Sequence, residues 1–133
     1  LLDMYKGMVA EKGLEECVVF PGKLAHKEVI KLYEESNIAL VSSNVETYGR
    51  CIAEPFALGR CLITKPTGVA LDIIRNGKNG FLYSNEDELV NILVKLKENP
   101  TLVSQIANQA FEDKKVFSRD NVIQSYLEVI RKA

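Results

Sequence analysis

Apolar and polar positions follow one another along the chain in blocks that predict helices and strands in turn. Residues 1–12 carry apolar side chains at a helical spacing, and Gly13 is a residue type at which helices commonly end. Cys17-Val18-Val19-Phe20 is a short, apolar, β-branched run closed by Pro21-Gly22, which predicts a buried parallel strand and a turn. Residues 26–35 return to a helical spacing.

The alternation continues through the rest of the chain. Apolar runs at 37–42, 61–64 and 81–83 predict three more strands, the last of them brief. Helical stretches are predicted between and after these runs, over about 49–58, 70–75, 101–116 and 119–132. Residues 84–87 resemble an N-cap region for a further helix that runs to about residue 99. Strands that alternate with helices predict an α/β fold, a Rossmann-like parallel sheet flanked by helices. Because such a sheet normally opens with a strand and this chain opens with a helix, we expect the fold to lack its first strand.

Parallel sheets of this kind bind ligands beyond the carboxyl ends of their strands. The loops that follow the predicted strands are therefore the candidate ligand-binding segments. They are residues 21–25, 42–48 and 65–69.

Composition narrows the class of protein. A length of 133 residues with 47% apolar content supports one core, so we expect one domain over residues 1–133. Lys and Arg number 17 against 18 for Asp and Glu, and a net charge of -1 provides no field that would recruit nucleic acid or an anionic membrane.

Apolar runs and cysteines bear on location. The apolar runs are too short to span a bilayer, and the first residues lack the pattern of a signal peptide. Cys17, Cys51 and Cys61 match no zinc or redox spacing and have apolar neighbours. We therefore expect a soluble, cytoplasmic protein with three reduced thiols in its core.

Two carboxylates, Glu46 and Glu54, stand eight positions apart around a predicted helix start. At the helical rise they would lie about 12 Å apart, which is more than the roughly 5 to 9.5 Å between two carboxylates that flank one bond. The pair suits the two ends of an elongated ligand. Thr47-Tyr48-Gly49 between them predicts a helix N-terminus, whose free amides and positive dipole end favour a phosphate.

Each of these residues also has a plain structural interpretation. A Glu before a helix is commonly only a partner of the helix dipole. Glu54 lies among apolar neighbours and needs a partner, either an Arg or Lys of the chain or a ligand, and we expect a ligand. His26, the single histidine, more often helps to start a helix than to bind or catalyse. A single arginine at a helix start, such as Arg50, is more often solvated than engaged with a phosphate, and both alternatives are left open.

This segment resembles the Glu-x(7)-Glu motif of the group 1 family of retaining glycosyltransferases, Glu-x-(Phe/Tyr)-Gly-x(4)-Glu followed by a turn with Gly. Glu46-Thr47-Tyr48-Gly49, Glu54 and Gly59 fit it. Other segments resemble family segments in the same order along nearly the whole chain: Val19-Phe20-Pro21-Gly22, Leu32-Tyr33, Asn37-Ile38-Ala39-Leu40-Val41, Thr67-Gly68-Val69, Asp72-Ile73-Ile74, Asn76-Gly77 and Asn79-Gly80-Phe81.

The resemblance implies the donor-binding, C-terminal domain of an enzyme of the GT-B fold, with two Rossmann-like domains. It implies hexosyl transfer from a nucleoside-diphosphate sugar to an acceptor held by a missing N-terminal domain, for which a peripheral membrane contact is left open. No cofactor or metal is expected. Glu46 is implied as the catalytic-side contact to the donor sugar and Glu54 as the acceptor of the ribose hydroxyls. The phosphate and base contacts are implied to be Thr47, Tyr48, Gly49, Gly22, Lys23 and Leu24.

Two features depart from the family pattern. Pro55 follows Glu54 where the family has Ala, and we expect it to kink the helix beside the ribose site. No basic residue of the chain matches the pair that balances the donor diphosphate. A sugar-nucleotide epimerase-like domain remains an alternative, as does a noncatalytic α/β regulatory or interaction module in which Glu46 and Glu54 only make ion pairs.

Overall fold

The structure, a computed structural model, describes residues 1–132, apart from the side chains of residues 125, 126, 128, 129 and 132. Its elements are, in chain order, α1 (Leu2–Glu11), α2 (His26–Glu35), β1 (Ile38–Val41), α3 (Arg50–Ala57), β2 (Cys61–Thr64), α4 (Ala70–Ile73), β3 (Phe81–Leu82), α5 (Glu86–Glu98), α6 (Pro100–Asp113), the 3-10 helix η1 (Lys114–Phe117) and α7 (Arg119–Lys132).

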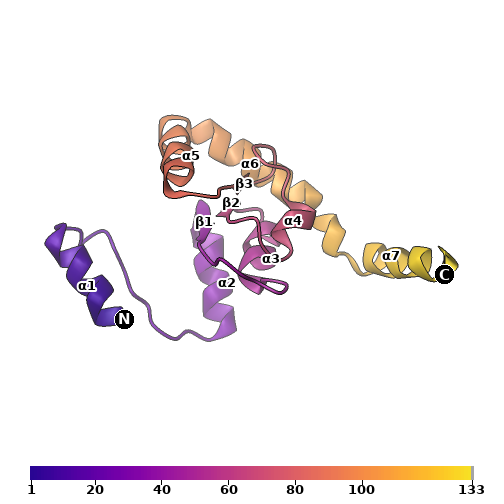
Figure 1. Cartoon of the computed structure of the whole chain (residues 1–133), viewed down its shortest axis with the longest axis horizontal. Coiled ribbons are helices and arrows are strands. Elements are labelled where there is room, and N and C mark those ends of the chain that lie inside the picture. The colour runs from indigo at the N-terminus through magenta and orange to yellow at the C-terminus, as the bar shows by residue number, and fades with distance from the viewer. Residues whose placement is uncertain (133) are drawn as a thin grey trace.

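The sheet has three parallel strands in the order β1-β2-β3. β1 and β2 pair from Ile38 with Cys61 to Val41 with Thr64, and β3 joins at Phe81, which pairs with Ile63. The predicted parallel α/β fold and its strands at 38–41, 61–64 and 81–82 are therefore confirmed (Figure 1).

Helices cover both faces of this sheet, as the continuous apolar runs of the strands predict. One face, with Ala39, Val41 and Leu62, packs against α3 and α4 through Ile52, Phe56 and their neighbours. The other face, with Cys61, Ile63 and Phe81, packs against α5 and α6 through Leu96 and Ile106. β2 lies in the middle and is buried along its whole length.

The predicted strand at 17–20 is wrong. These residues form no strand, and Val19 and Phe20 are 82% and 36% exposed. A parallel strand needs a neighbouring strand to pair its backbone groups, and in Figure 1 this segment lies with α1 away from the sheet, where no strand of residues 1–132 reaches it. That a strand precedes Leu1 stays a prediction.

The cysteines differ from the prediction of three core thiols. All three are free, but only Cys61 is buried, while Cys51 is half-buried and Cys17 is exposed. Burial raises the pKa of the Cys61 thiol to about 11. The apolar neighbours of Cys17 were a misleading signal, because they belong to the segment that does not join the sheet.

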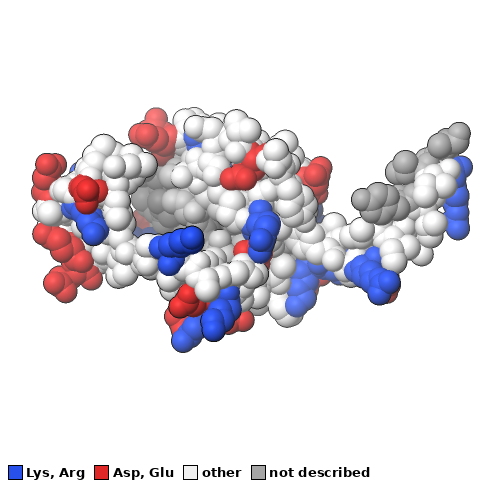
Figure 2. All heavy atoms as spheres, turned by 90° about the horizontal axis from the view of Figure 1, so that it is seen from below, with Lys and Arg blue, Asp and Glu red and all other residues white. Residues whose placement is uncertain are grey.

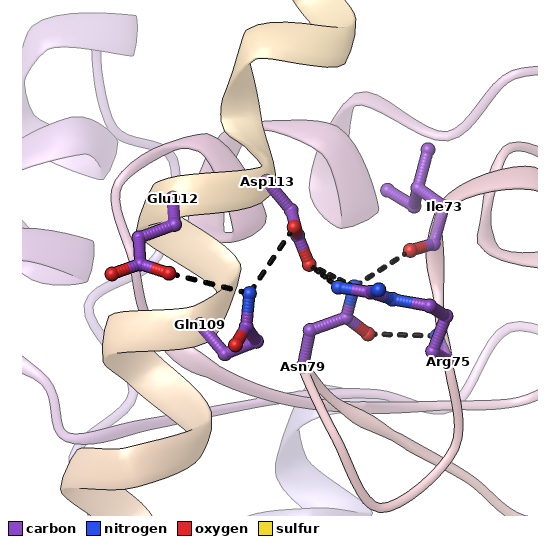
Figure 3. Close-up of polar contacts among 6 residues, drawn as sticks. All are labelled: Ile73, Arg75, Asn79, Gln109, Glu112 and Asp113. Carbon is purple, nitrogen blue, oxygen red and sulfur yellow. Dashed lines mark hydrogen bonds and ion pairs between the residues drawn. The ribbon is translucent and has the colours of Figure 1, made fainter.

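A buried side chain, Asn79, ties the turn before β3 to the end of α6 (Figure 3). Its Oδ1 accepts from the amide of Arg75 at 2.7 Å, and its Nδ2 donates to the carbonyl of Ile73 at 3.0 Å and to Asp113 Oδ2 at 2.8 Å. Asp113 also accepts from Arg75 and from Gln109. The Asn-Gly element of the sequence therefore has a structural role in this fold.

The face of the molecule in Figure 2 carries charges of both signs. On the face in Figure 2, Lys and Arg lie among Asp, Glu and uncharged residues, in keeping with the net charge of -1. Within residues 1–132, no helix combines the length and the apolar character needed to cross a membrane.

Candidate functional site

Two loops that follow neighbouring strands are joined at the carboxyl edge of the sheet. Residues 42–49 follow β1 and residues 65–69 follow β2. The amide of Glu46 donates to Thr67 Oγ1 at 2.8 Å, and the amide of Val69 donates to the carbonyl of Tyr48 at 2.8 Å. The buried Thr67 thus fixes the backbone of Glu46 from a distant part of the chain, a role that no feature of the sequence around Glu46 revealed.

Gly68 makes this close approach of the loops sterically feasible. Its φ is +52°, and a Cβ there would lie 2.6 Å from the carbonyl oxygen of Tyr48 and 2.9 Å from the Cβ of Glu46. Both distances are shorter than van der Waals contact. Only glycine fits the conformation and the space together.

Gly49 is the N-cap of α3, so the helix begins at Arg50 rather than within 47–49. Its φ of +86° is a left-handed conformation that favours glycine. The amides of Thr47, Tyr48 and Gly49 donate no hydrogen bond within the described part of the chain. Free amides therefore lie just before a helix N-terminus, as predicted, but the estimate of about 12 Å between the carboxylates assumed a helical rise over residues that precede the helix.

Glu46 is half-buried, and within the described residues its carboxylate has one partner, a thiol. Cys51 Sγ lies 3.7 Å from Glu46 Oε1. Burial, together with the Glu46 charge and this contact, raises the pKa of the Cys51 thiol. A neutral thiol thus borders the carboxylate and leaves most of its acceptor capacity unused.

Glu54 is held by two residues of the chain. Arg50, one turn earlier in α3, places Nε 2.8 Å and Nη2 2.7 Å from Glu54 Oε1. His26, the first residue of α2, places Nε2 3.0 Å from the same oxygen. Tyr33 of α2 also lies nearby, and its pKa is raised by burial first and then by the charges of Cys51 and Glu54.

This arrangement corrects three expectations. Arg50 is not merely solvated, and His26 does more than start a helix, because both contact Glu54. Glu54 obtains the partner that its position requires from within the chain, so burial alone does not call for a ligand. The i,i+4 spacing of Arg50 and Glu54 was the sequence signal that could have identified this pair.

The remaining predicted site residues differ in their setting. Gly22 and Lys23 are exposed and Leu24 is half-buried, in an irregular segment before α2 rather than at a strand end. Pro55 is buried inside α3, which continues through it to Ala57. A missing amide is therefore tolerated without a break in the helix.

Lys65 brings a cation to the carboxyl edge of the sheet, where no residue was matched to the diphosphate. Its ammonium donates to Asn44 Oδ1 and lies 5.9 Å from the centre of the Tyr83 ring. A hollow of about 440 Å³ opens between Ser42, Lys65 and Tyr83 and the start of α5. This hollow lies beyond the carboxyl ends of the strands, where sheets of this kind bind their ligands.

Comparison with known proteins places these features in a family. The sequence model of the family described as "Glycosyl transferases group 1" matches residues 1–113. The chain is 26% identical over 115 residues to an alpha-monoglucosyldiacylglycerol synthase of Acholeplasma laidlawii, which covers 84% of the chain and 29% of that protein. It is 27% identical over 132 residues to a probable sucrose-phosphate synthase of Thermosipho melanesiensis, covering 96% of the chain and 31% of that protein. The chain thus spans about a third or less of the curated relatives it matches.

Solved structures share the fold. Anabaena Alr3699/HepE in complex with UDP matches with a TM-score of 0.83 at 24% identity, over 99% of this chain and 37% of that one. The C-terminal domain of the Francisella tularensis group 1 family protein LpcC matches with a TM-score of 0.78 at 22% identity, over 86% and 60% of the two chains. From the family match over residues 1–113, we conclude that this chain belongs to the group 1 glycosyltransferases.

Proposed function

We propose that residues 1–133 form the donor-binding domain of a retaining glycosyltransferase that transfers a hexosyl group from a nucleoside-diphosphate sugar. The acceptor is held by a second, N-terminal domain. The observation that carries the proposal is the run of free amides at Thr47, Tyr48 and Gly49, which lies between the carboxylates of Glu46 and Glu54 at the carboxyl edge of the sheet. Free amides at a helix start favour an anion, and carboxylates accept hydroxyl hydrogen bonds.

In this proposal each group has one partner on the donor. Glu46 accepts hydroxyls of the sugar, the amides of residues 47–49 approach the diphosphate, and Glu54 accepts the ribose hydroxyls. Stabilisation of the leaving diphosphate is the share of catalysis that falls to this domain. Lys65 supplies a cation at the same edge.

The loop geometry supports this assignment. Thr67 and Gly68 hold Glu46 and the free amides in one backbone arrangement, and such preorganisation lowers the entropy that binding costs. Solved structures of the fold relative HepE contain UDP, UDP-glucose, or UDP with glucose, so UDP is the first nucleotide to test on this chain. GDP and ADP are the other two nucleotides to test.

A titration of the ¹⁵N-labelled chain, followed by NMR, tests the proposal. We expect Glu54→Ala to weaken UDP binding by about tenfold or more, because one hydrogen bond to a charged group contributes roughly 1.5 to 3 kcal/mol. Glu46→Ala should spare UDP and remove the advantage of UDP-glucose over UDP. Glu35→Ala is the matched control, since Glu35 forms an exposed i,i+4 pair with Lys31 away from the site.

Two results would contradict the proposal. Equal UDP affinity in the wild type and Glu54→Ala would remove Glu54 from the nucleotide site. No shift with UDP, GDP or ADP would favour the noncatalytic module, in which Glu54 serves only its ion pair with Arg50. We also expect the isolated chain to transfer no sugar, because retaining transfer needs an acceptor placed about 3 to 3.5 Å from the anomeric carbon.

A further inference from the structure

Three nitrogen atoms converge on one oxygen of Glu54. Arg50 Nε, Arg50 Nη2 and His26 Nε2 lie 2.8, 2.7 and 3.0 Å from Oε1. The other carboxylate oxygen, Oε2, accepts no hydrogen bond from any residue in 1–132. The two oxygens of the Glu54 carboxylate therefore differ in their hydrogen bonding: Oε1 has partners within the chain and Oε2 has none among residues 1–132.

This asymmetry has a chemical consequence. Each carboxylate oxygen has two lone-pair directions, and those of Oε1 face the guanidinium and the imidazole. Oε2 remains as the acceptor for two hydroxyl donors, such as the vicinal hydroxyls of a ribose.

We infer that Arg50 and His26 are positioning residues that orient the Glu54 carboxylate so that Oε2 receives the ribose hydroxyls of the donor. The inference rests on the proposed function of Glu54 and adds two residues to it, neither of which touches the nucleotide itself.

Two helices supply the contacts, and this fixes the carboxylate in space. Arg50 acts along α3 at the i,i+4 spacing, whereas His26 reaches across from the first turn of α2. A side chain held from its own helix and from a second helix has few rotamers left. Ordering Glu54 before the ligand arrives removes part of the entropic cost of binding.

The imidazole also orients the guanidinium. His26 Nε2 lies 2.9 Å from Arg50 Nη2 as well as 3.0 Å from Glu54 Oε1. Arginine only donates, so a neutral ring with its proton on Nδ1 accepts from Arg50, whereas a proton on Nε2 is donated to Glu54. In either tautomer the ring holds one member of the pair in place.

Because Arg50 and His26 are exposed, effects of their substitution on ligand affinity can be distinguished from effects on folding stability. Arg50 and His26 are 70% and 59% exposed, against 20% for Glu54. Exposed pairs contribute little to folding, so a variant that loses the Arg50 contact should keep its fold. Any effect on ligand affinity is then attributable to the site.

The test pairs a protein change with a ligand change. Dissociation constants for UDP and 2′,3′-dideoxy-UDP are measured by NMR titration for the wild type, Arg50→Met, Arg50→Lys and His26→Leu. The dideoxy ligand lacks the hydroxyls that Glu54 would accept. Lys31→Met is the matched control, because it removes the Lys31–Glu35 pair, an i,i+4 pair of the same kind on α2.

We expect the wild type to bind UDP about tenfold or more tightly than the dideoxy ligand. Arg50→Met should reduce that ratio by at least about threefold, as for residues coupled in one hydrogen-bond network, and leave the affinity for the dideoxy ligand unchanged. His26→Leu should reduce the ratio in the same direction. Arg50→Lys should restore part of it, and Lys31→Met should leave it unchanged.

The alternatives are distinguishable. Equal losses for both ligands in Arg50→Met and His26→Leu would assign these residues a purely structural role and overturn the inference, while a wild-type preference for UDP would still support the proposed function. A wild type that binds both ligands equally would overturn the proposed function and this inference with it. If Arg50→Met fails to fold, the ratio in His26→Leu decides.

Discussion

Replacement of Asn79 by alanine tests how the turn before β3 is held to the rest of the domain. The side chain is 1% exposed and makes three hydrogen bonds, to the amide of Arg75, the carbonyl of Ile73 and the carboxylate of Asp113. Alanine removes all three and leaves each partner in a partly or fully buried place. The loss is therefore larger than that of one surface contact.

The magnitude follows from the kinds of bond. A neutral hydrogen bond contributes about 0.5 to 1.5 kcal/mol and one to a charged group about 1.5 to 3 kcal/mol, so we expect Asn79→Ala to lower the free energy of unfolding by about 3 to 5 kcal/mol. The total free energy of unfolding of a small domain is about 5 to 15 kcal/mol. Asn79→Asp should be no milder, because it keeps the acceptor but sets a second carboxylate against Asp113.

Asn76→Ala is the matched control in the same turn. Asn76 is exposed, and its Oδ1 accepts one hydrogen bond, from the amide of Leu82 at 3.0 Å. Its loss should cost about 1 kcal/mol. Urea unfolding followed by far-UV circular dichroism measures both variants. A penalty for Asn79→Ala within about 0.5 kcal/mol of the control would refute the argument that this network anchors α6.

Three further predictions concern backbone, charge and thiols. Gly68→Ala should destabilise the chain and weaken UDP binding, whereas Gly77→Ala, at a φ of +74° with open space around it, should cost only the backbone strain of about 1 kcal/mol in urea unfolding. Burial alone raises the pKa of Asp113, but hydrogen bonds from its neighbours outweigh this and lower the pKa from 3.8. The wild type should therefore be more stable than Asp113→Asn at pH 7, and this difference should vanish as the pH falls through the lowered pKa. A difference in unfolding free energy that does not depend on pH would contradict this. Iodoacetamide at pH 8 should label Cys17 and spare Cys61 in a mass-spectrometric time course, since Cys61 is buried and its pKa is about 11.

Much of the fold could be predicted because its signals are local. The strands at 38–41 and 61–64 are short apolar runs bounded by turn residues, and the helices carry their own spacing and caps. Asn85 and Asn99, for example, cap α5 and α6 through their side chains, and these caps set the helix starts near their predicted positions. Such signals need no knowledge of distant residues.

The segment at 17–20 shows where local pattern fails. Its composition is that of a buried strand, but a strand exists only where a neighbour pairs with it, and pairing is a property of the whole sheet. β1 pairs with β2, and the run at 17–20 remains exposed. An apolar run therefore indicates that a segment can form a strand, but whether it does so depends on a neighbouring strand with which it can pair.

The candidate site was predicted residue by residue from the sequence, whereas several contacts of those residues were not, and the roles of the residues stay predictions. Glu46 and Glu54 were identified from spacing and resemblance, and the free amides between them from the expected helix start. The contact between His26 and Glu54 joins residues 28 positions apart and depends on how α2 packs on α3. No local pattern reports such a contact.

The conformation of the segment from Glu46 to Gly49 depends on residues outside that segment, in the loop after β2. Glu46 and the amides that follow it precede α3, so helical geometry does not fix them. Their backbone is fixed instead by Thr67 and Val69, and the approach requires a glycine at position 68 because a Cβ would meet the carbonyl of Tyr48. The proposed donor site on the segment from Glu46 to Glu54 would therefore depend on the loop after β2, and we expect a substitution at Gly68 to disturb it as directly as one inside the segment.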